Sequence, residues 1–561
     1  MQFNDGVKIN KYRWVLSFTL FLGCLAFSMG YCQASDAFFQ EEQRYQAQQK
    51  AEQDTRRNEA KDIFLQQDVS WEESDLFPEE TLMFPIQKIV LDGDVNQEFG
   101  WIQRKLNIYQ NCNIGKIGIG NLVQLITKNL IAKGYATTKI LVPEQDLSTG
   151  VLQLTILPGR IGQITILGET NAKWQSAFPL KQGDILNSQA IEQGLEQMMR
   201  VQSQDAQIQL FPGENLGETD IEITVKRGKQ SRSMLVIDDG GAKEIGKIQA
   251  RFMQNIDNLF NNNDTLSFAF GHDLAFDQDR KGMENYSIDY TFPYKNWTFT
   301  IDKYCYDYHQ NLVGFGRDFQ YSSKTNHIEL TAQSLLKRGK RSKTNIAFTI
   351  GKQVTNKYLE DIFIDMQSQE TTFGKVKLMH RWYNDAMVYD IGIGYKFNLP
   401  WFGAKPDVAE IVDNYNIWTF DGQVTMPIHI GGTKGWYSCQ IWGQYTKDFI
   451  YPSDEFAIGG RYTVRGFDGE QTLSDENGFV VRNEWSFPDK ENEYYFGIDW
   501  GRVSGRYTEE IAGHSLVGAV VGIRGGSDRM QYDVFVGCPI KKPQEYEVDS
   551  VCYGFELRYL L

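Results

Sequence analysis

An arginine and an aspartate in the last quarter of the chain have the residue types and surroundings of a buried ion pair. Arg465 lies in the glycine-rich run Gly459–Gly469, which predicts a loop because glycine permits backbone angles and close approaches that other residues do not. Asp499 lies in the segment 495–501, where large apolar residues alternate with glycine and aspartate at the period of a strand. Each motif alone also fits a solvated hairpin loop beside an ordinary strand, so the choice depends on the rest of the chain.

The other residue types that could do chemistry show no catalytic or metal-binding pattern. The six histidines are scattered, and none has the spacing of a metal site or a catalytic triad. Gly115, Gly118 and Gly120 lack the following Lys-Ser/Thr of a phosphate loop, so they are interpreted as the approach to a helix. The cysteines beyond residue 34 are odd in number and have no CxxC spacing, which argues against zinc and against a disulfide scaffold. The sequence therefore predicts no metal, no cofactor and no enzyme, and a net charge of −15 without a basic stripe argues against nucleic-acid binding.

The N-terminus has the composition of a signal peptide. Basic residues precede the apolar run Trp14–Met29, and Ala34 ends the expected cleavage site, so residues 1–34 are predicted to be removed; the alternative is an uncleaved anchor. Residues 36–61 contain good helix formers, neither Gly nor Pro, and few apolar side chains. Such a helix cannot anchor a core, so it is expected in water, in a polar cavity or partly disordered, and residues 62–82 follow as a linker.

Two similar α+β units are expected at residues 83–159 and 160–228. In the first, strands are expected at Pro85–Leu91, from Gly134-Tyr135 onward and at Val151–Leu157. A helix is expected at Asn121–Ala132, and a turn at Pro143-Glu144-Gln145. In the second, strands are expected at Ile161–Leu167, Ala206–Leu210 and Asp220–Lys226, with Pro212-Gly213 between the last two. The helix is expected at Ser188–Met199. Tandem units of this kind are small modules that can accept a partner strand on an exposed edge. The alternative is one ordinary α+β domain.

Residues 231–561 alternate at period two to the end of the chain. One face of each expected strand is rich in aromatic and aliphatic residues, and the other carries Gly, Ser, Thr, Asp and Lys. A soluble sandwich would keep its polar faces outside, whereas this pattern is typical of a transmembrane β-barrel with lipid outside and water inside. We expect about 16 antiparallel strands, an even number as in bacterial outer-membrane barrels. The aromatic terminal strand is of the kind that the barrel assembly machinery inserts into the outer membrane.

Several motifs in a fixed order resemble one known family. They are Phe84-Pro85-Ile86 with Asp92-Gly93, Gly134-Tyr135 with Pro143-Glu144-Gln145, Pro212-Gly213, Gly459-Gly460 with Val464-Arg465-Gly466-Phe467, Asp499-x-Gly501, and Gly522-x-Arg524-Gly525. With these motifs the chain resembles the TpsB transporters of two-partner secretion, in the haemolysin/haemagglutinin activation and secretion branch. The resemblance covers nearly the whole mature chain.

The resemblance implies an N-terminal plug helix, two periplasmic POTRA domains and a 16-stranded barrel in the outer membrane of a Gram-negative bacterium. A long loop at residues 449–477 would fold into the lumen, with Val464, Arg465, Gly466 and Phe467 at its tip. Asp499 and Gly501 would face the tip from the thirteenth strand, although Gly497 stands where relatives often have Phe.

The implied function is secretion. The POTRA domains would capture a large TpsA-type haemolysin, adhesin or toxin in unfolded form, and the barrel would conduct it to the cell surface. The partners implied are that exoprotein and outer-membrane lipid. Two rivals remain: an insertase of the same superfamily, which the plug helix and only two POTRA units disfavour, and a passive porin, which would lack the front half.

Overall fold

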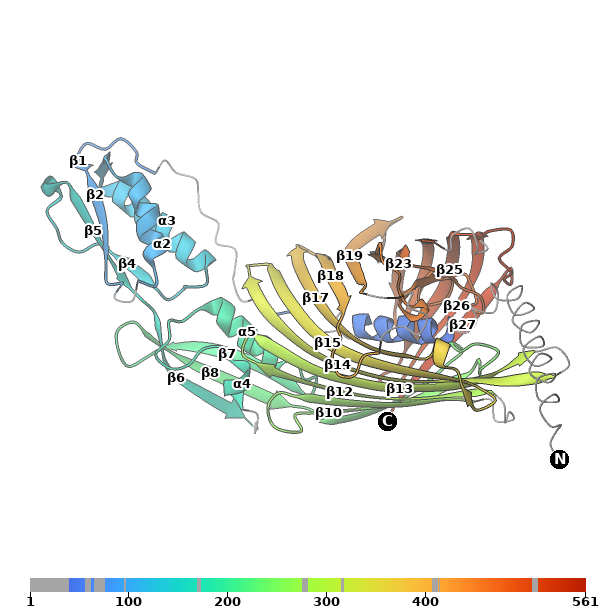
Figure 1. Ribbon diagram of the computed structural model, residues 1–561. Helices are drawn as coiled ribbons and strands as arrows, with labels where there is room; N and C mark the ends of the chain where they lie inside the picture. Colours follow the sequence, from blue (N-terminus) through green and yellow to red (C-terminus); the bar gives the residue numbers. More distant parts are fainter. Residues whose placement is uncertain are drawn as a thin grey trace, which may run out of the picture.

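The computed structural model describes the chain in segments, and it places two small α+β modules in a row outside one end of a barrel that contains a helix (Figure 1). The described residues are 40–55, 62–64, 76–94, 97–168, 173–274, 281–313, 317–405, 412, 414–506 and 513–561. The expected signal peptide and both ends of the expected N-terminal helix lie outside these residues. The expected domain boundaries stay predictions.

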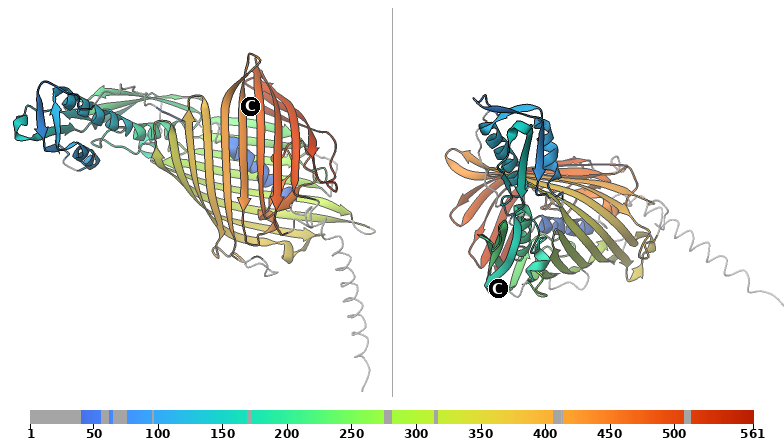
Figure 2. Two further views of the ribbon diagram at one scale, coloured as in Figure 1. Left: turned by 90° about the horizontal axis from the view of Figure 1, so that it is seen from above. Right: turned by 90° about the vertical axis from the view of Figure 1, so that its left-hand side faces the viewer.

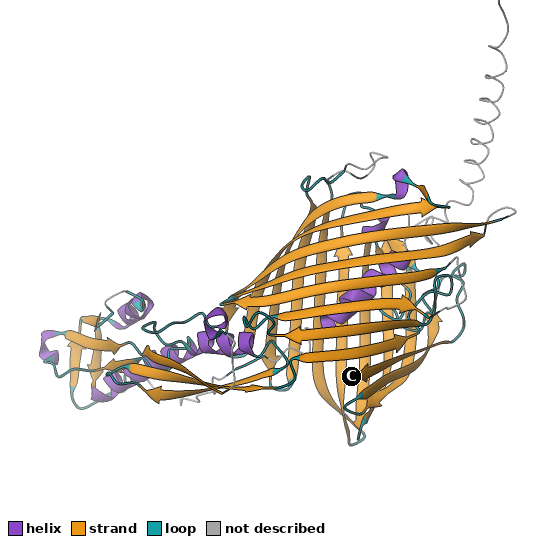
Figure 3. Ribbon diagram, turned by 90° about the horizontal axis from the view of Figure 1, so that it is seen from below, coloured by secondary structure: helices purple, strands orange, loops and turns teal. Residues whose placement is uncertain are grey.

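The expected barrel is confirmed. In the described part of the chain, sixteen antiparallel strands close into a ring in sequence order, and the last strand pairs with the first; the two-residue β16 (Ile362–Phe363) only extends β15, which pairs directly with β17. The strands are β9 (Ser231–Asp238), β10 (Gln249–Asp257), β11 (Thr265–Asp273), β12 (Gly282–Tyr294), β13 (Trp297–Val313), β14 (Asp318–Arg338), β15 (Ser342–Leu359), β17 (Gln369–Asn384), β18 (Met387–Asn398), β19 (Asn416–Ile430), β20 (Thr433–Tyr445), β23 (Asn477–Asp489), β24 (Asn492–Ser504), β25 (Ser515–Gly526), β26 (Met530–Lys541) and β27 (Cys552–Leu560). Figure 3 shows how long and tilted these strands are.

Strand β24 shows why the sequence closes into a barrel. Phe496, Ile498 and Trp500 point outward and are each more than two-fifths exposed, whereas Asp499 on the opposite face is fully buried. This division between an apolar outer face and a polar inner face is what a barrel in lipid requires, because the hydrocarbon cannot satisfy polar groups.

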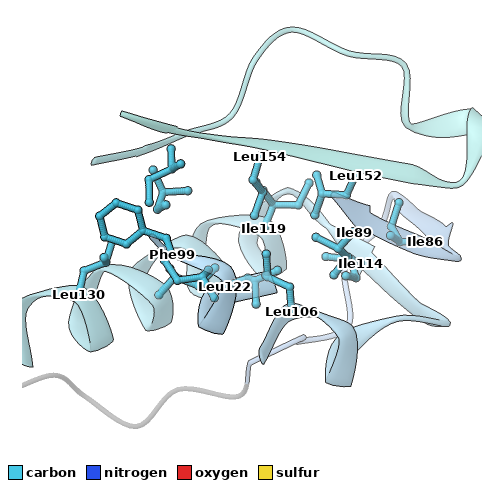
Figure 4. Packing of buried hydrophobic residues seen from close by; sticks show 14 residues of the cluster. Ile86, Ile89, Phe99, Leu106, Ile114, Ile119, Leu122, Leu130, Leu152 and Leu154 are labelled. Atoms are coloured by element: carbon cyan, nitrogen blue, oxygen red, sulfur yellow. The ribbon is translucent and has the colours of Figure 1, made fainter. Parts of the chain in front are cut away.

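The first module packs two helices against its strands. Its elements are β1 (Met83–Ile86), β2 (Lys88–Asp92), α2 (Gly100–Leu106), the 3₁₀ turn η1 (Asn107–Tyr109), β3 (Cys112–Gly115), α3 (Lys116–Ala132), β4 (Lys139–Leu141), the 3₁₀ turn η2 (Leu147–Thr149) and β5 (Val151–Leu157). Figure 4 shows the core, in which Phe99, Leu122 and Leu154 are completely buried. Strand β5 lies between β2 and β4, and β1 pairs with β3 in a separate two-stranded sheet.

Two details of the first module differ from the sequence prediction. The single strand expected at Pro85–Leu91 is wrong: it divides into β1 and β2, because the N–H groups of Gln87 and Lys88 both donate to the carbonyl of Gly150 and the chain changes partner there. The strand expected to begin at Gly134-Tyr135 is also wrong. Gly134 has a φ of +92°, and its N–H and that of Tyr135 close the end of helix α3, so β4 begins only at Lys139.

The second module repeats the arrangement and rests on the barrel. Its elements are β6 (Arg160–Gly168), α4 (Trp174–Ala177), α5 (Ser188–Met198), β7 (Gln204–Pro212) and β8 (Glu218–Arg227), with β8 in the centre of the sheet. Arg338 of β14 donates to Gln193 of α5 at 2.9 Å and to the carbonyl of Ile63 at 3.0 Å. Asp62 contacts Lys343 of β15 and Tyr383 of β17. Residues 62 and 63, at the start of the expected linker, are therefore held at the junction between the second module and the barrel.

The N-terminal helix, described over residues 40–55, lies inside the barrel, as the end-on view of Figure 2 shows. Among the described residues, no helix is both long and apolar enough to cross a membrane.

Candidate functional site

The loop between β20 and β23 folds into the barrel and contains the sequence motif. It carries a 3₁₀ turn (η4, Pro452–Asp454) and two short strands that pair with each other, β21 (Phe456–Ile458) and β22 (Leu473–Asp475). Its tip, residues 464–467, lies against β24, β25 and β26. The contact is tight: a Cβ on Gly466, whose φ is +98°, would lie 2.5 Å from the carbonyl oxygen of Cys538, and a Cβ on Gly518 would lie 1.9 Å from that of Arg465. Only glycine fits at these two positions.

Arg465 at the tip binds Asp499 of β24 through three hydrogen bonds. The guanidinium donates from Nε to Oδ2 at 2.7 Å and from Nη2 to Oδ1 at 3.0 Å, and the backbone N–H of Arg465 donates to Oδ2 at 3.0 Å. Asp499 is fully buried and Arg465 is 7% exposed. A two-pronged, charge-assisted pair of this kind fixes both position and orientation.

The pair belongs to a larger charge network that sequence reasoning missed. Glu484 of β23 contacts the Arg465 guanidinium and also accepts from Arg524 of β25, whose Nη1 lies 2.9 Å from its Oε1. Arg482 of β23, the cross-strand partner of Asp499, places its Nε 3.7 Å from Asp499 Oδ2. Glu484 and Arg482 are two residues apart and share the lumen face of β23. Charged residues at every second position of a predicted inward face are the sequence signal that could have identified them.

The glycines beside Asp499 make room for the loop tip. A Cβ on Gly497 would lie 2.4 Å from Nη2 of Arg465, and a Cβ on Gly501 would lie 2.7 Å from Cγ2 of Val464. At Gly497, where relatives often have Phe, the Arg465 guanidinium itself occupies the space beside the strand.

Apolar residues on both sides of Arg465 complete the seat of the loop. Val464 is fully buried and Phe467 is 2% exposed, and the Phe467 ring meets the edge of Tyr546 at 5.8 Å between centroids. They belong to one apolar cluster of buried residues: Ile458, Val464, Phe467, Leu473, Val480, Val503, Leu516 and Tyr546. We call this set the loop cluster.

A second arginine joins the loop to the closure of the barrel, where β9 meets β27. Arg461 donates from Nη1 to Asp239 at 3.1 Å and lies 3.9 Å from Asp238. Asp239 in turn accepts from the backbone N–H of Phe555 in β27 at 2.9 Å. The loop therefore contacts the first and last strands as well as the wall formed by β24 and β25.

The N-terminal helix contacts both the loop and the barrel wall. Gln43 donates to the carbonyl of Pro452 at 2.9 Å, and Arg44 donates to the carbonyl of Gly469. On the other side, Glu52 pairs with Arg251 of β10, which lies 3.4 Å from Asp238. A cavity of about 370 Å³ remains between the helix, the loop and β27. The helix and the loop together occupy much of the channel.

The predicted positions in the two modules lie outside the barrel and do not meet Arg465 (Figure 1). Tyr135 packs edge-on against Phe99 at 5.1 Å between centroids. Gln145, two residues after Pro143, bonds the backbone of Gln153 with its side-chain amide. The amide donates to the carbonyl of Gln153 at 2.8 Å and accepts from the N–H of Gln153 at 2.7 Å. Pro212 ends β7, and Gly213 donates to the carbonyl of Glu218 in the following turn. All six shape turns or helix ends.

Nothing in the described segments is arranged for metal chemistry. No group of three His, Cys, Asp or Glu side chains there could hold a metal ion, and the five cysteines described are free.

Comparisons with known proteins agree with this architecture. Residues 217–525 match the family model described as haemolysin secretion/activation protein ShlB/FhaC/HecB, residues 84–159 match a ShlB-type POTRA domain, and residues 160–212 match a second POTRA domain. The outer membrane transporter CdiB-2 of Burkholderia pseudomallei is 33% identical, and the match covers 94% of each chain. CdiB of Dickeya dadantii is 28% identical over 82% of each chain. The solved structure of CdiB from Acinetobacter baumannii has a TM-score of 0.85 at 26% identity, and the match covers 94% of this chain and 99% of that one. The chain therefore belongs to the ShlB/FhaC/HecB family and is a two-partner secretion transporter of the outer membrane, with its POTRA domains in the periplasm.

Proposed function

We propose that Arg465 and Asp499 form a latch that holds the inward loop in place while the N-terminal helix gives way to an unfolded TpsA-type haemolysin, adhesin or toxin. The observation that carries the proposal is the way each element is held in the lumen. The loop is fixed by a buried ion pair and an apolar cluster, whereas the helix is held mainly by polar side chains. A channel that opens needs one element that stays and one that leaves.

Capture begins at the POTRA modules. Strand β7 is an edge strand of the second module, and Leu210 and Phe211 on it are each 44% exposed. An extended segment of the exoprotein can add to such an edge through backbone hydrogen bonds while apolar side chains supply further contact. The positions at Gly134, Tyr135, Pro143, Gln145, Pro212 and Gly213 then act by shaping the modules.

Passage through the barrel requires no catalytic step by this chain. The helix leaves the lumen, the exoprotein enters, and folding of the exoprotein outside the cell prevents its return. The apolar outer face of the barrel contacts outer-membrane lipid, and β27 carries the signal read by the barrel assembly machinery.

The test is the change Arg465→Ala in the full-length transporter, co-expressed with the large exoprotein that it secretes. Truncation leaves the buried Asp499 carboxylate without its main partner, so we expect normal membrane insertion and loss of the exoprotein from the medium. Arg502→Ala is the matched control, because Arg502 is an exposed arginine on the same strand as Asp499.

Two results would contradict the proposal. Normal secretion by the Arg465→Ala variant would show that the ion pair is not needed to hold the loop during transport. A general fall in other outer-membrane proteins on deletion of the wild-type gene points to an insertase instead.

A further inference from the structure

Four tyrosines form one aromatic patch inside the barrel. Tyr304, Tyr306 and Tyr308 alternate along the lumen side of β13, and Tyr321 of β14 packs in the same cluster. Tyr306, Tyr308 and Tyr321 are each 1% exposed, and the rings of Tyr306 and Tyr308 lie 5.6 Å apart. We call these four residues the tyrosine face.

An apolar patch of this size inside a water-filled barrel requires a binding partner that covers it. The lumen face of a water-filled barrel is ordinarily polar, and each tyrosine ring can bury roughly 150–250 Å² of surface. Four such rings side by side would leave an apolar patch of several hundred Å² in water, the scale that marks an interaction surface.

At rest the N-terminal helix covers Tyr304 and Tyr306 of this face. The ring of Tyr45 stacks on Tyr306 with centroids 4.2 Å apart and planes 14° apart, and it meets the edge of Tyr304 at 5.4 Å. The hydroxyl of Tyr306 donates to Glu41 on the preceding turn of the helix. Tyr45 is the only apolar side chain of the described helix that is buried. The tyrosine face is therefore the helix's principal apolar contact.

We propose that the tyrosine face also binds the exoprotein in transit, taking aromatic and other apolar side chains of the unfolded segment where Tyr45 sits at rest. This inference rests on the proposed function, because Tyr304 and Tyr306 are uncovered only when the helix leaves. Ring stacking tolerates many sequences and is weak for each side chain, so an unfolded chain can be held in the channel and still move on. The Tyr306 hydroxyl loses Glu41 when the helix leaves and can then bond an unpaired backbone group of an extended segment.

Changes on the two sides of the same contact separate this inference from a simple seat for the helix. Tyr45→Ala removes the helix side, and Tyr306→Ala removes the barrel side. Both loosen the helix, so both should raise ion leak through the purified transporter in planar bilayers. Only Tyr306→Ala should also slow secretion, by about two- to tenfold, the range that one aromatic pair contributes. Tyr45→Ala should secrete at least as fast as the wild type.

The measurement is the initial rate at which the exoprotein appears in the medium, with full-length transporter at matched outer-membrane levels. Tyr306→Phe keeps the ring and controls for misfolding of the alanine variant; it should secrete close to the wild-type rate. A photo-crosslinking phenylalanine analogue at position 308 should capture the exoprotein during transport, whereas the same analogue at the lipid-facing Ile301 should not.

Equal secretion rates for Tyr45→Ala and Tyr306→Ala overturn the inference, as do crosslinks from position 308 that reach only the helix. The proposed function fails differently, through normal secretion by the Arg465→Ala variant, which neither tyrosine variant measures.

Discussion

Two segments share the lumen of this barrel, the loop between β20 and β23 and the N-terminal helix, and they are held by different forces. The loop shares a cluster of eight buried apolar side chains with the barrel wall. The helix buries Tyr45 as its one large apolar side chain, and its other buried residues are polar: Glu41, Glu42, Gln43 and Gln48. Each segment also has a charged contact with the wall, from Arg465 to Asp499 for the loop and from Glu52 to Arg251 for the helix.

The difference explains which segment can move. Apolar side chains pulled from the loop cluster would meet lumen water, at about 25 cal/mol for each Å² exposed. The polar contacts of the helix would be exchanged for hydrogen bonds to water, so each contributes only about 0.5–1.5 kcal/mol net. On the proposed function, we therefore expect the loop to stay in the barrel when the helix leaves.

The largest expected effect comes from removing the carboxylate that the loop grips. Asp499→Ala leaves the Arg465 charge buried with Glu484 as its remaining carboxylate partner, and breaking one partner of a buried pair costs about 3–5 kcal/mol. We expect a clear fall in the thermal unfolding temperature of the purified barrel, together with loss of secretion. The double change Arg465→Met, Asp499→Leu should recover much of the stability, because apolar residues can replace a buried pair. If Asp499→Ala unfolds at the wild-type temperature, the pair does not hold the loop.

A smaller effect is expected from the apolar side of the loop's seat. Val464→Ala removes two buried methyl groups, worth about 0.8 kcal/mol each, so we expect a loss of roughly 1.5 kcal/mol in the free energy of unfolding. The matched control is Val521→Ala on β25, where the valine is 60% exposed on the outer face of the barrel. Denaturant unfolding of the two variants in the same detergent checks the prediction. Equal losses would mean that the loop cluster contributes no more than the outer surface does.

The lumen position of Asp499 could be predicted from the sequence, because its strand alternates without interruption and period two assigns each side chain to a face. The roles of Glu484 and Arg524 could not. They reach Arg465 from neighbouring strands, and which inward charges meet depends on the path of the loop and on register across three strands.

The sequence predicted the α+β class of the first module but misplaced two of its strands. The break in the strand expected at Pro85–Leu91 depends on Gly150, far along the chain, which no local pattern reveals. Gly134 was interpreted as the start of a strand, whereas it ends a helix, and glycine serves both purposes. Local patterns thus located the elements, and long-range contacts decided where some of them end.

The smallest expected effect tests the helix side of the comparison. Glu52→Gln keeps a hydrogen-bond acceptor for Arg251 but removes the charge, so we expect the docked helix to lose about 1 kcal/mol. That is about a fivefold increase in the ratio of channels without the helix to channels with it. The measurement is the ion conductance of the purified transporter in planar bilayers, and Gln53→Ala, at an exposed neighbouring position, is the control. Because the loop cluster is untouched, the unfolding temperature of the barrel should not change. A rise in conductance without a fall in barrel stability would show that helix and loop are held independently. A rise in conductance together with a fall in barrel stability would mean that the helix is a structural part of the barrel, as the loop is.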